Sequence, residues 1–295
     1  MKILIIGASG QLGYDLVRQA FSCNVIVETP TRQQMDITKI SQIERTITNM
    51  RPSLVINAAA YTNVDKAETE PELAFAVNKT GIANLAQSCC ERKIPLIHIS
   101  TDYVFSGKKG KPYVEKDSTA PLGVYGQSKA EGEEKLRSIL KAHIILRTSW
   151  LYGVFGHNFV KTILKLSQQN EEISVVADQY GSPTSATDLA DALLKMAFHI
   201  VKKTKVFWGT YHYCGKGITT WHEFAETILA MAKFYGSIRT HRVKPITTDE
   251  FPTPARRPAF TALDCSRIKK NFGIMPKPWQ ASLQQTIGKI FSDNE

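Results

Sequence analysis

The sequence predicts an α/β fold, a Rossmann-like doubly wound parallel sheet with a smaller, partly interleaved C-terminal substrate domain. Three observations support this prediction. Short runs of β-branched and other apolar residues alternate with amphipathic stretches through the first half of the chain. These runs show little polar alternation, which is typical of strands covered by helices on both faces of a parallel sheet. Three glycines directly follow the first run, at the point where such folds bind a dinucleotide.

The alternation of strands and helices begins at the start of the chain. The expected strands are residues 3–6, 25–27, 54–56, 96–99 and 144–147. The helices expected between them are residues 11–21, 40–50 and 71–92, followed by a helix that includes Tyr125. Thr38 is the expected N-cap of the second helix, and Pro71 suits the first turn of the third.

The second half of the chain is less regular. Helices are expected at residues 158–169, 187–198, 220–235 and 279–291, and further strands at "ISVVAD" and "GTYHYC". The Pro-rich stretch "FPTPARRP" predicts a loop near a site. We therefore expect residues 1–150 to form the cofactor-binding domain, with some later segments returning to it, and residues 151–295 to form mainly the substrate-binding domain.

Composition limits the function classes. The 295 residues are 43% hydrophobic and 22% charged, and no apolar run approaches the length of a membrane helix, about 20 residues. The first residues predict a buried strand rather than a signal peptide. The five cysteines are scattered without a metal or CxxC spacing, so reduced thiols and a cytoplasmic location are expected.

The net charge of +10 is the one unusual bulk property. A basic protein can bind nucleic acid or another polyanion. Here the Lys and Arg residues are spread along the chain, and no nucleic-acid-binding signature accompanies them. We therefore expect no nucleic acid or membrane partner, but a solvated basic surface together with a pocket for phosphorylated small molecules.

The glycine loop "IIGASGQLG" lies between the first strand and the first helix. Its spacing is GxxGxxG, in which glycine permits a tight turn and a close approach of the backbone to a pyrophosphate. The helix that follows offers free N–H groups and a partial positive charge. The alternative is a plain strand-to-helix turn. The residues assigned here to the cofactor are Gly7, Ser9, Gly10, Gln11, Leu12 and Gly13.

The ribose end of the cofactor is expected after the second strand, in "VETPTRQQMDIT". Glu28 could accept from ribose hydroxyls, whereas Arg32 suits the 2′-phosphate of NADPH better. The alternative for Arg32 is a solvated loop cation. The sequence therefore favours NADPH, with NADH possible. Asp36 and Ile37 follow at the place where an adenine ring could rest.

Small residues end the third strand, in "INAAAYTNVDKAE". Ala58, Ala59 and Ala60, followed by Tyr61, leave room for a cofactor to lie across the carboxyl end of the sheet. Ordinary tight packing is the alternative for each alanine taken singly.

Four motifs occur in a fixed order: the glycine loop, "NAAAYT", "STDYVF" and a YxxxK formed by Tyr125 and Lys129. Together they resemble the extended short-chain dehydrogenase/reductase superfamily. "STDYVFSG", "RTSWLYG" and "ISVVADQYGSPTSATDLA" narrow the resemblance to the dTDP-4-dehydrorhamnose reductase family. The match runs from residue 1 to about residue 280, estimated from the order of the motifs.

The resemblance implies that Thr101, Tyr125 and Lys129 are catalytic. Residues i and i+4 share one face of a helix, so the phenol and the amine can act together. A free tyrosine has a pKa near ~10, which a nearby ammonium and an oxidised nicotinamide would lower. Lys129 is also assigned to the nicotinamide ribose, and the Thr101 hydroxyl to the carbonyl oxygen, with Ser100 as the neighbouring candidate. Without the family, a Tyr–Lys pair on a helix is more often surface decoration.

The substrate residues implied by the resemblance are Asp102, Tyr103, Trp150 and Arg257. Related dehydratases have Glu where this chain has Tyr103, so the acid pair for eliminating water is incomplete. Asp102 is assigned to a substrate hydroxyl, or alternatively caps the following loop. Trp150 stacks on the sugar or lies in the core. Arg257, with Arg256 beside it, pairs with the substrate pyrophosphate or is a solvated loop cation.

Some members of the family dimerise through a metal that acidic residues bind. The matching residues, Asp15 and Asp188, are shorter than the glutamates expected there, so we predict no metal and a monomer or homodimer. His98 lies in an apolar strand and is interpreted as a core residue with its hydrogen bonds satisfied.

The expected reaction is NADPH-dependent reduction of the 4-keto group of dTDP-6-deoxy-L-lyxo-4-hexulose to dTDP-L-rhamnose, a precursor of surface polysaccharide such as lipopolysaccharide O-antigen. One alternative is another nucleotide-sugar reductase or an epimerase, and an epimerase would show no net redox change. The other is a non-catalytic regulatory subunit related to that of methionine adenosyltransferase. Retention of Thr101, Tyr125 and Lys129 argues against this last alternative.

Overall fold

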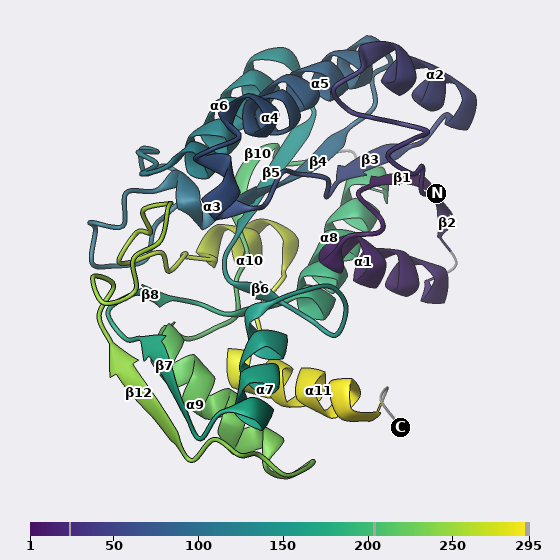
Figure 1. Ribbon diagram of the computed structural model, residues 1–295. Coiled ribbons are helices and arrows are strands. Elements are labelled where there is room, and N and C mark those ends of the chain that lie inside the picture. The colour runs from purple at the N-terminus through teal and green to yellow at the C-terminus, as the bar shows by residue number, and fades with distance from the viewer. Residues whose placement is uncertain (24, 203–204, 293–295) are drawn as a thin grey trace.

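The computed structural model describes residues 1–23, 25–202 and 205–292. Its centre is a six-stranded sheet in the order β10-β5-β4-β3-β1-β2, in which every neighbouring pair is parallel (Figure 1). The strands are β1 (Lys2–Ile6), β2 (Ile26–Glu28), β3 (Leu54–Asn57), β4 (Leu96–Thr101), β5 (His143–Thr148) and β10 (Gly209–His212). The strand order reverses between β1 and β3, so the chain is wound in both directions from that point.

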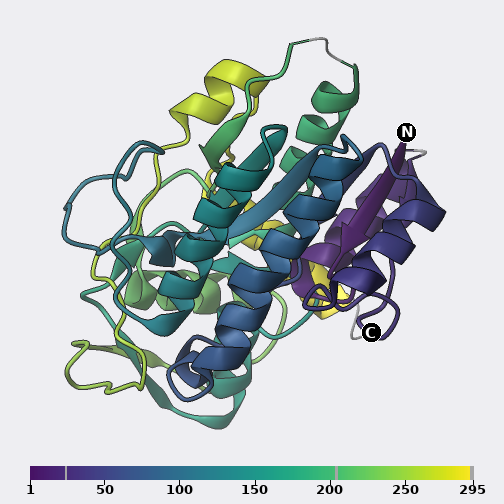
Figure 2. The same cartoon turned by 90° about the horizontal axis from the view of Figure 1, so that it is seen from above.

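Helices cover both faces of this sheet because successive strand residues point to opposite sides. Ile3 and Ile5 of β1 are buried in one apolar cluster, whereas Leu4 and Ile6 are buried in the other. The first cluster is completed by α1 (Gln11–Ser22) and α8 (Ala186–Lys202). The second is completed by α2 (Ile40–Met50), α5 (Gly81–Glu91) and α6 (Val124–Ile139), which lie over the strands when the molecule is seen from above (Figure 2). The doubly wound α/β prediction is confirmed.

The long helix expected over residues 71–92 is helical throughout but not uniformly α-helical. It consists of α4 (Pro71–Phe75), the π-helical turn η1 (Ala76–Thr80) and α5. Asn78 in the π turn is buried, and its side chain accepts from Tyr61 N at 2.9 Å and donates to Tyr61 O at 3.0 Å. This π turn therefore holds the loop that follows β3.

The start of α2 differs from the prediction. Lys39 is its N-cap residue and makes no side-chain cap. The Thr38 hydroxyl instead donates to Asp36 Oδ1 at 2.8 Å. The prediction of Thr38 as N-cap was wrong because a nearer carboxylate competes for its hydroxyl.

A second lobe lies below the sheet in Figure 1 and has its own apolar core. Its helices are α7 (Phe159–Gln169), α9 (Trp221–Ala232) and α11 (Trp279–Ser292), and its parallel strand pair is β7 (Glu172–Val176) with β12 (Arg242–Ile246). A capping box begins α9: the Thr220 hydroxyl accepts from Glu223 N while the Glu223 carboxylate accepts from Thr220 N. Short elements complete the fold: α3 (Val64–Ala67), η2 (Asp102–Val104), β6 (Leu151–Tyr152), β8 (Tyr180–Gly181), β9 (Thr184–Ser185), β11 (Thr219–Thr220) and α10 (Ser266–Phe272).

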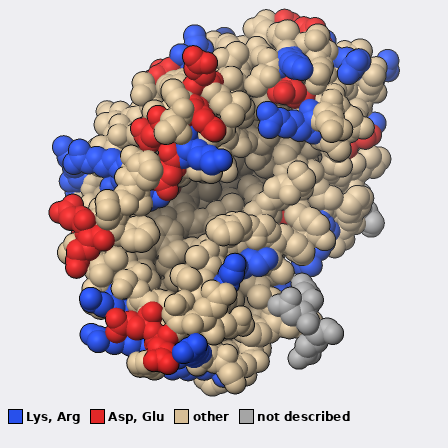
Figure 3. Space-filling view, viewed as in Figure 1, with Lys and Arg blue, Asp and Glu red and all other residues tan. Residues whose placement is uncertain are grey.

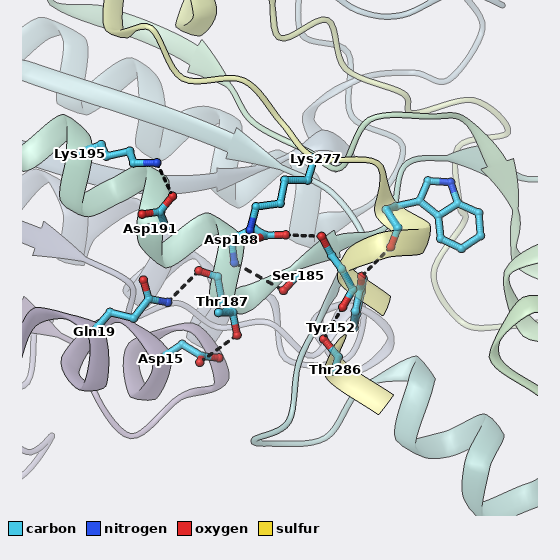
Figure 4. A network of polar contacts seen from close by, with 12 residues as sticks. Asp15, Gln19, Tyr152, Ser185, Thr187, Asp188, Asp191, Lys195, Lys277 and Thr286 are labelled. Atoms are coloured by element: carbon cyan, nitrogen blue, oxygen red, sulfur yellow. Dashed lines mark hydrogen bonds and ion pairs between the residues drawn. The ribbon is translucent and has the colours of Figure 1, made fainter. Parts of the chain in front are cut away.

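Segments from the second half of the chain return to the sheet. Residues 209–212 pair with β5 as the sixth strand, and α8 packs against α1. A polar network at the start of α8 connects these returning segments to the second lobe (Figure 4). The Thr187 hydroxyl donates to Asp15 of α1 at 3.1 Å, and Asp188 Oδ1 accepts from Lys277 Nζ at 2.7 Å. Asp188 Oδ2 accepts from the Ser282 hydroxyl of α11.

The structure also bears on the expectations for membrane helices and for the cysteines. None of the helices in the described part of the chain is long and apolar enough to cross a membrane. All five cysteines are free thiols.

Candidate active site

A cleft of about 1250 Å³ opens at the carboxyl ends of the strands. It extends from the glycine loop after β1 to Trp150, which follows β5 at the entry to the second lobe. Figure 3 shows it as a hollow across this face, with mainly uncharged side chains inside and charged ones at the rim. The cleft begins where the strand order reverses, the usual ligand position in open α/β sheets.

The glycine loop has the close packing that a dinucleotide cradle requires. Gly7 has a φ of +82°, and a Cβ there would lie 2.6 Å from Ala59 N. A Cβ on Gly13 would lie 2.1 Å from Gly7 O, so the first turn of α1 is pressed against the loop. Gly10 is the N-cap of α1 and supplies no side-chain acceptor, which leaves the helix N–H groups for an anion. Loop, helix start and the alanine residues after β3 therefore fit a pyrophosphate group.

The expected ribose end lies at the edge of the same cleft. Arg32 lines it and is exposed, with its Nε 3.9 Å from Asp36 Oδ2. Asp36 and Ile37 also line the cleft, although Asp36 Oδ1 already accepts from Thr38. Glu28 does not line it, among the residues described, and lies 3.6 Å from Lys2. The geometry favours Arg32 over Glu28 as a cofactor contact.

Tyr125 and Thr101 meet at the inner end of the cleft. Burial raises the pKa of Tyr125 to about 12, although a hydrogen bond with the Thr101 hydroxyl acts in the lowering direction. Without a bound cofactor, the Tyr125 side chain is therefore a protonated phenol at neutral pH. The lowered Tyr125 pKa, which was expected with the oxidised cofactor bound, stays a prediction for that complex.

The choice between Ser100 and Thr101 follows from strand alternation. The Ser100 hydroxyl donates to Glu133 Oε1 at 2.6 Å, on the α6 side of the sheet. Thr101 accepts from Tyr103 N at 3.2 Å and donates to Asp102 Oδ1 at 3.0 Å. Ser100 is thus engaged with Glu133, whereas Thr101 is the residue whose hydroxyl interacts with the Tyr125 phenol.

Lys129 is buried below Tyr125 and lines the cleft with it. Its Nζ donates to Ile99 O at 2.6 Å and lies 3.1 Å from His98 Nε2. Burial lowers the pKa of Lys129 to about 8, and the Glu133 carboxylate acts in the opposite direction. The surface-decoration alternative does not describe this lysine, because its exposed fraction is 1%.

Asp102 is a buried carboxyl group in the cleft wall. Its Oδ2 atom has no hydrogen-bond partner among the described residues. Burial raises the pKa of Asp102 to about 6, partly offset by the hydroxyls of Thr261 and Thr101. An acceptor held free in this way can bind a donor on a ligand, as the substrate assignment requires.

Trp150 has a backbone φ of +46°, unusual for a bulky residue. Its indole stacks on Trp221 with ring centroids 3.6 Å apart and an interplanar angle of 8°. A Cβ on Gly181 would lie 2.4 Å from the indole, so this glycine makes room for the ring. Trp150 is at once a junction residue and a cleft-lining residue.

Arg257 contacts Tyr103, one of the other predicted substrate residues, but most of its hydrogen bonds are made elsewhere. Its guanidinium pairs with Asp65 at 2.8 Å and also donates to Thr253 and to Ala255 O at 3.1 Å. These bonds attach the Pro-rich loop to α3. Arg257 is not among the described residues that line the cleft, whereas Tyr103 is, with its ring edge-on to Tyr125 at 5.7 Å. The pyrophosphate contact assigned to Arg257 would require some of these bonds to change.

Sequence reasoning missed three polar residues near the catalytic group. Asn57 and His98 are bonded behind Lys129, and Thr148 Oγ1 is buried at the cleft without a partner among the described residues. No local sequence signal pointed to Asn57, because only the observed register of β3 and β4 sets it directly beside His98. His98 does lie in the core, as expected, but one of its partners is the predicted catalytic lysine.

The two carboxylates considered for a metal do not converge. Asp15 accepts from Thr187, whereas Asp188 accepts from Lys277 and Ser282. Within residues 1–23, 25–202 and 205–292, no group of three or more His, Cys, Asp or Glu side chains is arranged to hold a metal ion. The absence of a metal stays a prediction.

Known proteins are similar to this chain in sequence and in fold. The family model described as "RmlD substrate binding domain" matches residues 1–291. A dTDP-4-dehydrorhamnose reductase of Sinorhizobium fredii is 40% identical over 298 residues, covering 100% of this chain and 99% of that protein. The chain belongs to the dTDP-4-dehydrorhamnose reductase family. The resemblance drawn from the sequence motifs is thereby confirmed.

Solved structures of dTDP-4-dehydrorhamnose reductases agree. The Clostridium acetobutylicum protein has a TM-score of 0.92 and 38% identity, covering 98% of this chain and 99% of that one. The Bacillus anthracis protein, in complex with NADP, has a TM-score of 0.91 and 37% identity over the same shares of the two chains. A UDP-glucose 4-epimerase of Thermus thermophilus has a TM-score of 0.81 at 21% identity, a likeness that concerns the fold alone.

Proposed function

We propose that this protein reduces the 4-keto group of dTDP-6-deoxy-L-lyxo-4-hexulose with NADPH and yields dTDP-L-rhamnose. The observation that supports this most strongly is that Thr101, Tyr125 and Lys129 line one cleft together with the glycine loop. The names of the full-length relatives support the same reaction, and the NADP complex of the Bacillus anthracis relative supports the cofactor.

The residues that would hold the cofactor follow the cleft from one end to the other. The loop from Gly7 to Gly13 would bind the pyrophosphate, and Arg32 the 2′-phosphate, with NADH as a weaker alternative. Asp36 and Ile37 would border the adenine. Ala58, Ala59, Ala60 and Tyr61 would lie under the middle of the cofactor, and Lys129 would bind the nicotinamide ribose.

The reaction needs a hydride, a proton and a site that favours a developing alkoxide. A reduced nicotinamide, when bound, supplies the hydride. Tyr125 donates its phenolic proton to the carbonyl oxygen, and the Thr101 hydroxyl donates a hydrogen bond to the same oxygen. Thr101 must turn its proton from Asp102 toward the substrate to do so, since its hydroxyl donates to that carboxylate in the structure.

The sugar would be oriented by Asp102, Tyr103 and Trp150. Asp102 Oδ2 is the free acceptor for a sugar hydroxyl, and the indole of Trp150 offers an apolar surface to a sugar face. Arg257 is proposed for the substrate pyrophosphate, after exchange of part of its bonding with Asp65.

The proposed domain organisation follows the two lobes of the molecule. Residues 1–150, with α8 and β10 returning, would form the cofactor domain, and residues 151–295 mainly the substrate domain. A monomer or homodimer without a metal, acting in the cytoplasm, completes it, and the free thiols support the location. Sedimentation with and without a chelator tests the oligomer.

The decisive experiment is a direct assay. The dTDP-ketosugar is incubated with NADPH or NADH while absorbance of the reduced nicotinamide is followed, and the product is identified by mass and stereochemistry. Net consumption of NADPH with formation of dTDP-L-rhamnose is expected. Conversion of the sugar without net consumption would instead indicate an epimerase.

A further inference from the structure

A buried row of side chains connects the end of β3 with the catalytic lysine. Asn57 of β3, His98 of β4 and Lys129 of α6 have exposed fractions of 0%, 0% and 1%. Asn57 Nδ2 lies 3.0 Å from His98 Nδ1, and His98 Nε2 lies 3.1 Å from Lys129 Nζ. Groups buried this deeply must satisfy their hydrogen bonds with one another.

The orientation of the Asn57 amide is fixed by the backbone of Ala59. Ala59 N can only donate, and it donates to Asn57 Oδ1 at 3.2 Å. Ala59 O can only accept, and it accepts from Asn57 Nδ2 at 3.3 Å. Both contacts require the same orientation, so the second hydrogen of Nδ2 is directed at His98 Nδ1.

The tautomer of His98 follows from this donor. A nitrogen that accepts a hydrogen bond carries no proton, so Nδ1 is bare and the ring is neutral. The single proton of a neutral imidazole is then on Nε2, which makes Nε2 a donor toward Lys129.

Lys129 Nζ therefore faces an N–H group. An ammonium carries hydrogens only and would oppose the Nε2–H bond, whereas an amine has a lone pair that can accept it. We propose that Asn57 and His98 are positioning residues that stabilise the neutral amine of Lys129, so that the catalytic lysine can release and regain a proton during turnover. The amine keeps its two hydrogens for Ile99 O and for the cleft.

Electrostatics agree with the geometry. Burial, and next the charge of Lys129, hold the pKa of His98 well below its usual range. Burial also lowers the pKa of Lys129 to about 8. Among the described residues, Tyr125 of its own helix and Asp102 of η2 line the same cleft as Lys129, and Glu133, one turn further along α6, also acts on it.

Glu133 is the group that would favour the ammonium, but its charge is already engaged. Its carboxylate accepts from Arg147 of β5 at 2.6 Å and 2.9 Å and from Arg137 at 2.5 Å. On the π turn, Lys79 is paired with Glu131 at 2.5 Å. Neither neighbour therefore outweighs the effect of burial and of the His98 donor.

This inference deepens the proposed function, on which its catalytic meaning rests. After Tyr125 has protonated the product, a phenolate remains. An Nζ–H bond of the Lys129 ammonium breaks as an O–H bond forms on Tyr125. The lone pair that this leaves on Nζ then accepts a hydrogen bond from His98 Nε2–H. The amine regains its proton from solvent. A permanently charged lysine would stabilise the phenolate but could not return the proton.

The first test is NMR of the wild-type protein without substrate, so that it does not depend on the reaction. Histidine labelled with ¹⁵N should show His98 protonated at Nε2 and bare at Nδ1. Lysine labelled at Cε and Nζ should show one residue that titrates near pH 8. His98 protonated at Nδ1, or protonated on both nitrogens at pH 7, would overturn the inference.

The second test uses variants. In His98→Gln the side-chain carbonyl can accept from an ammonium, so the Lys129 titration should move upward by about one pH unit or more. The basic limb of the kcat profile should move with it. The matched control is His143→Gln. His143 is another buried histidine, and burial lowers its pKa as well. It begins β5, at the end of the strand away from the cleft, where its ring contacts Leu140 O at 2.5 Å.

The outcomes test the hydrogen-bond assignment and the proposed reductase function separately. An unchanged Lys129 titration in folded His98→Gln protein contradicts the inference, and equal shifts in both variants do so as well. If His98→Gln does not fold, the wild-type NMR result decides. Absence of reductase activity with the predicted NMR states would overturn the proposed function and leave the hydrogen-bond assignment standing.

Discussion

Tyr125 is the residue on which the proposed proton transfer depends most directly. Tyr125→Phe removes the phenolic proton but keeps the ring that packs edge-on against Tyr103. Turnover should fall by ~100-fold or more, the scale of a lost general acid, while NADPH affinity stays nearly unchanged. Initial rates and a fluorescence titration of NADPH measure the two quantities.

A second buried tyrosine provides the control for that substitution. Tyr113 stacks on Phe105 with ring centroids 4.1 Å apart and does not line the cleft, among the described residues. Tyr113→Phe should keep nearly full turnover. Retained turnover in Tyr125→Phe would remove the phenol from its role.

Asp102 gives substrate binding a pH dependence. With a pKa near 6, its carboxyl group is protonated below that pH and ionised above it. The ionised form is the better acceptor for a sugar hydroxyl, so KM should rise as the pH falls from 7 to 5. Asp102→Asn should raise KM at pH 8 by ~10-fold, the scale of a lost charged hydrogen bond, and remove this limb. A KM profile that is flat in the wild-type protein would refute the assignment.

At the scale of residues, the sequence pointed to Thr101, Tyr125 and Lys129, which line one cleft, but not to the side chains that support them. Spacing places Tyr125 and Lys129 on one helix face, and the family resemblance of the ordered motifs adds Thr101 and implies the shared role of the three residues. Asn57 and His98 are 41 positions apart, and no local pattern joins them. Only the parallel register of two strands brings them together.

At the scale of elements, the junction of β1 and α1 combines folding with cofactor binding. A Cβ on Gly13 would collide with backbone at 2.1 Å and 2.6 Å, whereas a Cβ on Gly10 would meet only Gly7 O at 3.3 Å. Gly13→Ala should therefore lower the free energy of unfolding by about 1–3 kcal/mol or more, the scale of overpacking. Urea unfolding measures this loss.

Gly10→Ala is the matched comparison on the same loop. It should fold with nearly wild-type stability but weaken NADPH by ~10-fold, because the added methyl group separates backbone and pyrophosphate. Equal affinity in Gly10→Ala and the wild-type protein would show that the phosphates lie elsewhere.

The elements of the first half were predictable because burial on both faces selects apolar strands. The interruption of residues 71–91 by a π turn was not, since it satisfies the backbone of Tyr61, a residue outside the helix. β12 was missed for a different reason. Its sequence, RVKPI, is mostly exposed and includes a proline, so it carries no strand pattern, and only pairing with β7 defines it.

At the scale of the whole molecule, the free energy of unfolding should depend on pH. Burial lowers the pKa of His98, His143 and His212, and that of His212 to about 3 with a further contribution from the Arg147 charge. The unfolded chain takes up these protons below a pH of about 6.5, whereas the folded protein does not. The stabilising effect is therefore complete above about pH 6.5 and is lost progressively as the pH falls toward 3. This direction holds for all three histidines.

Urea unfolding at pH 7.5 and pH 5 tests this at the level of the molecule. Linkage gives about 2 kcal/mol of lost stability at pH 5 for each histidine that stays neutral only when folded. His212→Gln should shrink the difference between the two pH values by about this amount, even if it destabilises the protein at both, because glutamine has no proton to gain. His241→Gln is the control, since His241 is exposed in the folded protein as in the unfolded chain. A pH difference equal in His212→Gln and the wild-type protein would mean that other groups cause the acid sensitivity.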